Sequence, residues 1–324
     1  GAGGDSLYVE DVFSTYLYAG TGATHNIVND IDLSGEGGMV WSKTRDTGVR
    51  HSLVDTERGA AAMLTPNETW ANQTTFDSTL SFNSDGYTLG ADAGNQRVNN
   101  SAYDYVGWTF RKAEKFFDVV TYTGDGTSNR QIAHNLETAP ACIIVKRLNN
   151  TANWAVWHQG FNGGSTTGGG FLNLTGAFGT EALFSNNSSA FSDSYFLVSN
   201  SSNRETNGYL DTYVAYVFAS DAGGFGDDGT ENIIKCGSFN TYAEINLGFE
   251  PQWVLYKRSD GAGSWSIVDN MRGWVNSGND KILFPDTSGA ESDGQRGHPT
   301  ASGMLPINGG SDTYIYIAIR RPMK

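Results

Sequence analysis

The chain has 324 residues, of which 12% are aromatic and only 17% charged, and Gly, Ser, Thr and Asn are abundant. Aromatic residues suit a pleated sheet and Gly and Asn suit turns, so this composition predicts an all-β chain. The net charge of −14 disfavours binding to nucleic acids. No apolar stretch reaches the ~20 residues of a membrane helix, so membrane insertion is not expected.

An ordered series of landmarks recurs three times along the chain. A strand-like run ends in Lys43, Lys146 and Lys257, which are 103 and 111 residues apart. Twelve residues after each Lys a second apolar run ends, and an aromatic run closes each copy at residues 104–110, 211–218 and 312–319. A period of this length fits a complete small domain better than a solenoid repeat, so three tandem domains with their own cores are predicted.

The landmarks also set the expected boundaries. They predict an extended N-terminal segment over 1–12, and β-domain repeats over 13–115, 116–222 and 223–324. A Gly- and Asp-rich linker is expected over 221–231. The many short strand-like runs favour antiparallel β-sandwiches of a jelly-roll-like kind.

Two of the closing runs, 213–218 and 314–319, are apolar on both faces. Such strands fit either the middle of a sandwich or an interface on its outer face. They are therefore where a contact between copies of the chain is expected, in a homo-oligomer that could be a trimer.

Residues that carry chemistry are scarce at useful spacings. The five histidines form no zinc-site pattern, no Gly-x-Ser-x-Gly elbow occurs, and the Gly-rich run 162–170 lacks the Lys-Ser/Thr of a phosphate loop. The Asp-Gly pairs at 125–126 and 228–229 are better explained as turns than as calcium ligands. We therefore predict a protein that is not an enzyme, with no catalytic, cofactor or metal residues.

One acidic position recurs in two copies. Asp55 and Asp269 each precede an Arg by three residues, Arg58 and Arg272. The pattern favours structural ion pairs that tie a strand end to its turn over a catalytic carboxylate, because the second copy has His158 at this position.

Exposed tryptophans would offer stacking surfaces for sugars. Trp154 and Trp265 occupy equivalent strand positions, so they are expected in the core. Trp70 and Trp274 lie in irregular, polar surroundings and are the predicted glycan contacts. Cys142 and Cys236 each lie in an apolar run and are expected to be buried free thiols.

Several segments resemble a domain of uncharacterised function in virion structural proteins of tailed phages, notably marine phages. The resemblance rests on residues 9–18, 31–40, 116–124, 133–136 with Pro140, and 312–316, and it thins in the third copy at 297–306. It implies a component of the phage particle and carries no catalytic residues.

The first hypothesis is a virion tail fibre, appendage or receptor-binding protein, exposed on the particle surface. Its expected partners are other virion proteins, further copies of itself and a host cell-surface glycan. A capsid-bound decoration protein is the main alternative. A glycan-degrading depolymerase and a secreted adhesin of non-phage origin are weaker alternatives, and a signal peptide upstream would favour the latter.

Overall fold

The computed structural model describes residues 6–74, 77–94, 97–185, 191–200, 204–276, 278–306 and 310–323. The predicted all-β class is confirmed, because antiparallel sheets make up nearly all of the regular structure in these residues. The helical elements described are short: η1 (Val9–Asp11), α1 (Leu33–Glu36) and η2 (Asn162–Gly164).

Each repeat builds one main sheet with the same strand order. In the first repeat the order is β1 (Phe13–Ala19), β7 (Asp104–Arg111), β3 (Gly38–Thr44) and β4 (Ser52–Asp55). In the second, read from the same edge, it is β8 (Phe117–Thr123), β14 (Thr212–Phe218), β10 (Cys142–Arg147), β11 (Trp154–His158) and the short β12 (Gly170–Phe171). In the third it is β15 (Ile234–Phe239), β23 (Tyr314–Arg320), β17 (Pro251–Arg258) and β18 (Ser266–Asp269).

A smaller antiparallel sheet accompanies each main sheet. The first repeat pairs β2 (His25–Val28), β6 (Gly86–Leu89) and β5 (Thr79–Asn83). The second pairs β9 (Arg130–Ala133) with β13 (Tyr195–Val198). The third pairs β16 (Ile245–Asn246), β22 (Gly303–Leu305) and β21 (His298–Thr300), and separately β19 (Asp280–Ile282) with β20 (Ser292–Gly294). We call a main sheet with its smaller sheet a lobe; each lobe lies within one predicted repeat.

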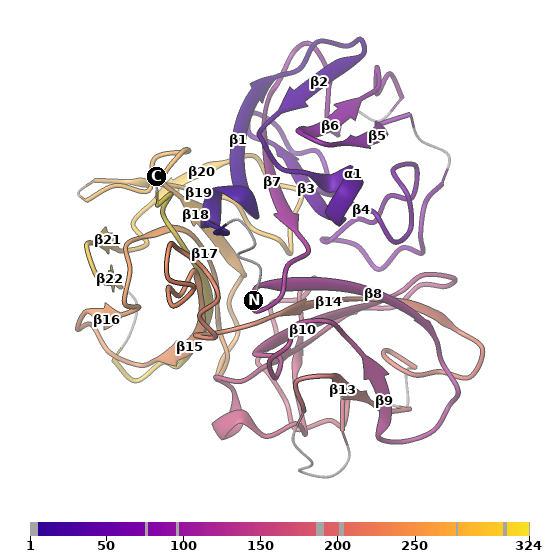
Figure 1. Cartoon of the computed structure of the whole chain (residues 1–324), viewed down its shortest axis with the longest axis vertical. Helices are drawn as coiled ribbons and strands as arrows, with labels where there is room; N and C mark the ends of the chain where they lie inside the picture. Colours follow the sequence, from indigo (N-terminus) through magenta and orange to yellow (C-terminus); the bar gives the residue numbers. More distant parts are fainter. Residues whose placement is uncertain are drawn as a thin grey trace.

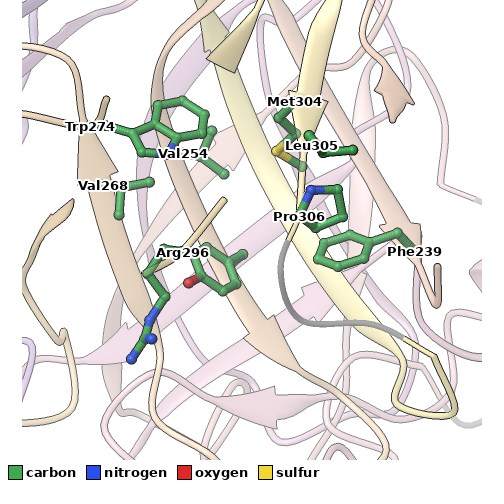
Figure 2. A pocket seen from close by; sticks show the side chains of 9 residues that line it. Phe239, Val254, Val268, Trp274, Arg296, Met304, Leu305 and Pro306 are labelled. Atoms are coloured by element: carbon green, nitrogen blue, oxygen red, sulfur yellow. The ribbon is translucent and has the colours of Figure 1, made fainter. Parts of the chain in front are cut away.

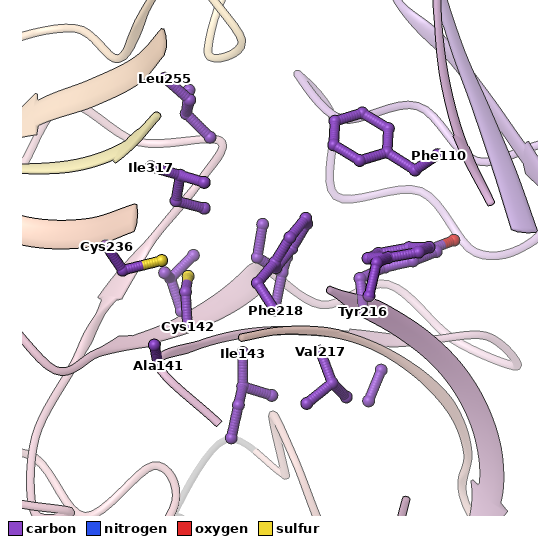
Figure 3. Packing of buried hydrophobic residues seen from close by; sticks show 14 of the residues in the cluster. Phe110, Ala141, Cys142, Ile143, Tyr216, Val217, Phe218, Cys236, Leu255 and Ile317 are labelled. Atoms are coloured by element: carbon purple, nitrogen blue, oxygen red, sulfur yellow. The ribbon is translucent and has the colours of Figure 1, made fainter. Parts of the chain in front are cut away.

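The three lobes meet at a common centre and spread from it in different directions (Figure 1). The largest hydrophobic cluster, here called the shared core, contains residues of all three repeats. At its centre the Phe110 ring lies 5.9 Å from that of Phe218 and 5.5 Å from that of Trp253, so one aromatic from each lobe meets there. Figure 3 shows Phe110, Phe218 and Leu255 in this cluster. The expectation of separate cores is therefore corrected, although the first and third lobes also have smaller clusters of their own.

Side-chain alternation explains why the closing strands are apolar on both faces. In the third lobe, Ile315, Ile317 and Ile319 belong to the shared core, whereas Tyr316 and Ala318 belong to the cluster of that lobe alone. Successive side chains of a strand point to opposite faces, so each main sheet lies between two apolar layers. These strands are buried within the chain and leave no face open for a second copy, which corrects their assignment as an oligomer contact.

The two segments expected to be extended or linking are folded against the body. Val9 and Val12 are buried in the shared core, and Val9 begins a 3-10 turn in the segment expected to be extended. In the predicted linker Phe225 is buried and the Gly226 amide donates to the carbonyl of Leu7. Close to this segment, the Met323 amide donates to the Glu10 carboxylate at 2.9 Å.

The outer end of each lobe repeats one further motif. A ring on the first strand stacks on its registered partner on the last strand, with centroid distances of 5.1 to 5.3 Å: Tyr18 with Tyr105, Tyr122 with Tyr213, and Phe239 with Tyr314. Two loops extend beyond each pair, at 20–24 with 98–103, 124–129 with 204–211, and 240–244 with 310–313. We call each loop pair a lobe tip.

Candidate functional site

The two predicted ion pairs are buried at matching positions. The Asp55 carboxylate accepts from the Arg58 amide at 3.0 Å and from Arg58 Nε at 2.7 Å. Asp269 accepts from the Arg272 amide at 2.9 Å and from Arg272 Nε at 2.6 Å. Both carboxylates are 0% exposed, so no substrate reaches them, and the arrangement suits a structural role.

These positions also join one lobe to the next. Tyr216 of the second lobe donates to Asp55 of the first at 2.7 Å, and Trp108 of the first donates to Asp269 of the third at 3.1 Å. In the second lobe, the Gly160 amide donates to His158 Nδ1, so the ring proton lies on Nε2, 2.9 Å from the Tyr316 carbonyl of the third. The three contacts form a closed ring.

The substitution of His for Asp follows from its neighbour. The residue equivalent to Trp108 and Tyr216 is Ile317, which has no donor, so only a backbone carbonyl is available there. A carboxylate cannot donate to a carbonyl, but a neutral imidazole can. Burial lowers the pKa of His158 to about 4, which keeps the ring neutral.

A second ring of contacts lies eight residues after the repeated Lys. His51 Nε2 lies 3.1 Å from the Phe284 carbonyl, Trp154 Nε1 donates to the Glu68 carbonyl at 3.0 Å, and Trp265 Nε1 donates to the Phe171 carbonyl at 2.9 Å. In each case the acceptor belongs to the preceding lobe in cyclic order. Trp41 donates to His51 Nδ1, which places the His51 proton on Nε2. The core positions predicted for Trp154 and Trp265 are confirmed.

A third ring uses only the backbone, two residues after each Lys. The carbonyls of Arg45, Leu148 and Ser259 accept from amides of the preceding lobe at 2.8 to 2.9 Å; the donors are Glu291, Asn72 and Phe178, respectively. Three rings of equivalent contacts therefore hold the lobes together.

The repeated lysines are buried beside these joints. Each ammonium donates to backbone carbonyls; Lys146 bonds to Ala152 in its own lobe and to Thr69 in the first, and Lys257 bonds to Thr175 in the second. Burial lowers the pKa of Lys146 to about 7 and those of Lys43 and Lys257 to about 8. All of their hydrogen bonds go to backbone carbonyls, so we assign these lysines a structural role at the joints between the lobes.

Trp274 is not at the surface, which corrects its prediction as a sugar contact. Its side chain is 4% exposed, and Nε1 donates to the Gly297 carbonyl at 3.1 Å. It lines a small, mainly apolar pocket with Phe239, Tyr256 and Met304 (Figure 2). Polar neighbours in the sequence suggested exposure, but the turn after Asp269 returns the chain over the β17–β18 sheet, where the indole packs.

Trp70 is half-buried and already in contact with two cations. The Arg50 guanidinium lies 4.6 Å from the ring centroid and that of Arg97 lies 5.6 Å from it. Such cation–π contacts occupy the ring within the molecule. A sugar would therefore compete with these guanidinium groups for the ring.

The most exposed large aromatics lie instead at two lobe tips. Tyr209 is 64% exposed and Tyr242 is 61% exposed, and Leu210 beside Tyr209 is 65% exposed. Sequence reasoning missed them, although Asn207-Gly208 before Tyr209 is a turn signal that predicts display on a loop. These two tips therefore present the most exposed large aromatic rings of the described residues to a ligand.

Metal and membrane features were also considered for the described residues. In them no group of three or more His, Cys, Asp or Glu is placed to hold a metal ion. The Asp125 carboxylate accepts from Thr127 and Asn207; although burial opposes ionisation, these hydrogen bonds lower its pKa to about 2. Across the same residues, no helix is both long and apolar enough to span a bilayer. Cys142 and Cys236 are buried free thiols, as predicted.

Comparison with known proteins gives one match. A family model described as a domain of unknown function (DUF7483) matches residues 9–321, a range that takes in all three repeats. No curated protein and no solved structure matches the chain. The chain therefore belongs to the DUF7483 family.

Proposed function

We propose that the protein is a non-enzymatic structural component of a phage particle surface, in a tail fibre, appendage or receptor-binding assembly. The observation that carries the proposal is the closed set of contacts between three equivalent lobes. The buried charged and polar groups described above are used for holding these lobes in place rather than for lining a cleft. The resemblance of several segments to virion proteins of tailed phages supports the proposed location.

The geometry suits display of surface loops. The first strand of each lobe starts in the shared core, and at ~3.3 Å per residue the seven residues of β1 reach about 23 Å outward. The three lobe tips therefore lie well apart on a rigid frame, an arrangement that favours simultaneous contacts with a repetitive surface. Other virion proteins are the proposed partners at the remaining surface.

Immunogold electron microscopy of intact particles, with an antibody raised against this chain, tests the proposal. Gold at the tail or its fibres is the expected result. Gold spread over the head would replace this proposal with the capsid decoration role. Unlabelled particles, with the antibody shown to recognise the purified chain, would overturn the phage assignment.

A further inference from the structure

The tips of the second and third lobes share an exposed tyrosine held against a turn. The backbone and Cβ of Tyr209 lie against Gly126, which has φ of +75°, whereas the ring of Tyr242 lies against Gly310, which has φ of +79°. Tyr209 lies on the second loop of its tip and Tyr242 on the first loop of its tip, and each contacts a glycine of the facing loop. In the first lobe the corresponding neighbours are Gly22 and Ser101, so a serine takes the place of the tyrosine at this contact.

The second tip holds its tyrosine on a firmly supported loop. Asp211 forms ion pairs with Arg147 at 2.6 Å and with Arg204 at 2.8 Å. The Leu210 amide donates to the Gly124 carbonyl at 2.9 Å. Buried Asn207 bridges the two loops, because it accepts from the Asp125 amide and donates to the Thr127 carbonyl. The tyrosine is therefore presented on a backbone with little freedom left to lose.

Backbone strain occurs at the same place. Leu210 has φ of +62° and Arg204 has φ of +58°, in the left-handed region that non-glycine residues rarely adopt. Such backbone strain clusters at ligand-contacting sites. At this tip it turns a large apolar side chain and an aromatic ring toward solvent.

We propose that the tips of the second and third lobes bind neutral sugar rings through Tyr209 and Tyr242. This inference rests on the proposed function and names its ligand class. A tyrosine face carries negative charge density that attracts the polarised C–H groups on the apolar face of a pyranose, and a ring with two torsions loses little entropy on binding. Side chains that can hydrogen-bond the hydroxyls of a sugar lie at each tip: the partly exposed Asp125 and Arg204 at the second and Glu244 at the third.

The charges favour a neutral sugar over an acidic one. At the second tip Arg204 and Arg130 lie 2.8 Å and 3.5 Å from Asp211 and Asp125, so the guanidinium groups are already compensated. The net charge of −14 adds a repulsive field against polyanions. Two such tips on one rigid chain allow bivalent attachment, so modest affinity at each tip gives much tighter binding overall.

The test compares the full chain with Tyr209→Ala, Tyr242→Ala and the double variant. The probes are an immobilised panel of neutral and acidic oligosaccharides and intact cells of the phage host. Each single variant should weaken binding to a neutral sugar about tenfold, as expected for the loss of one anchoring aromatic, and the double variant should lose it. Tyr209→Phe should retain binding, because the ring face is kept. Leu80→Ala is the matched control, since Leu80 is 50% exposed but lies in the first lobe.

Unchanged binding by the double variant would overturn this inference, as would binding to acidic sugars alone or to no sugar in the panel. If the double variant still binds cells and gold labels the tail, the tips are not the binding site, but the proposed function is unaffected. Failure of the proposed function is recognised separately, by particles that carry no gold.

Discussion

Tyr216 in the second lobe donates a hydrogen bond of 2.7 Å to Asp55 in the first, 161 residues away in the chain. The same carboxylate holds Arg58, so one buried anion joins a turn of its own lobe to the closing strand of the next. A buried carboxylate that accepts from three donors is favourable in the folded state only while all of these donors are present. The joint between the lobes therefore depends on Asp55.

Asp55→Asn should destabilise the protein by about 3–5 kcal/mol, because it leaves the Arg58 guanidinium buried without its counter-charge. Tyr216→Phe removes the hydrogen bond to Asp55 and the longer one accepted from Arg58 at 3.3 Å, and should cost about 2 kcal/mol. Urea unfolding of the two single variants and the double variant gives the coupling energy, which should exceed 0.5 kcal/mol for residues in contact.

Tyr122→Phe is the matched control for this cycle. Its hydroxyl donates at 2.7 Å to the Thr206 carbonyl, within the second lobe. It should lose stability without any coupling to Asp55→Asn. Additive effects of Asp55→Asn and Tyr216→Phe would mean that the contact between the lobes contributes nothing to stability.

Acid should weaken the joint at His158. Its pKa is about 4 in the folded chain, below the ordinary 6.5 of an unfolded chain, so between these values only the unfolded state takes up a proton. Stability should fall by up to ~1.4 kcal/mol for each pH unit from 6.5 to 4, about 3 kcal/mol in all. Protonation also removes the acceptor that the Gly160 amide uses.

Urea midpoints measured at pH 7, 5.5 and 4.5 check this dependence. His158→Gln should unfold more easily at pH 7 but show a shallower acid slope than the wild type. Part of the slope should remain, because burial also lowers the pKa of His51. Equal slopes in wild type and His158→Gln would contradict the assignment.

Alkaline pH should stabilise the folded protein through Lys146. Burial lowers its pKa to about 7, against an ordinary 10.4, so between these values the unfolded chain holds a proton that the folded chain has released. Stability contributed by this group therefore rises as pH increases from about 7 to 10. The neutral amine still has two N–H donors, enough for the Thr69 and Ala152 carbonyls.

Lys146→Met should be destabilised at pH 7, because those two carbonyls lose their donor. The deficit relative to wild type should widen by about 2 kcal/mol between pH 7 and 9, as the wild type alone gains stability. Lys235→Met is the control, since its ammonium pairs with Asp221 and the side chain is 28% exposed. A constant deficit would show that Lys146 keeps its charge over this range.

The repeats, their main strands and the Asp–Arg pairs could be predicted from the sequence, because they follow local patterns at constant spacing. What could not be predicted is where those residues find partners. His51 and Phe284 are 233 residues apart, and nothing in the neighbourhood of either residue encodes their contact. Polar neighbours suggested exposure for Trp274, but its burial is decided by the turn that precedes it.

The closing strands over 213–218 and 314–319 show the same limit of sequence-based prediction. A strand that is apolar on both faces has two equally good explanations, a second layer of the same chain or another copy of the chain. The sequence of 314–319 does not distinguish them, because a cyclic arrangement of three repeats depends on how distant segments close on each other. For this reason, the prediction of separate domains with their own cores did not foresee the shared core.

The shared core predicts that the chain unfolds as one unit. Phe110 of the first lobe packs against Phe218 of the second and Trp253 of the third, and the shared core contains residues of all three lobes. Losing any lobe therefore exposes apolar surface on the remaining ones. Tryptophan fluorescence and near-UV circular dichroism should report a single coincident transition in urea. Two or three separated transitions would show that the lobes are independent domains.

The second lobe expressed alone, as residues 116–222, gives a stricter test of whether the lobes depend on each other. In this fragment Trp154 loses its Glu68 acceptor, Tyr216 loses Asp55, and Phe218 loses its ring contact with Phe110 of the first lobe. The fragment also loses the Lys146 contact with Thr69. With buried polar groups unpaired and one face of the main sheet exposed, it should lack cooperative unfolding and near-UV signal. A fragment that unfolds cooperatively would instead mean that the three rings of contacts join lobes that are already stable alone.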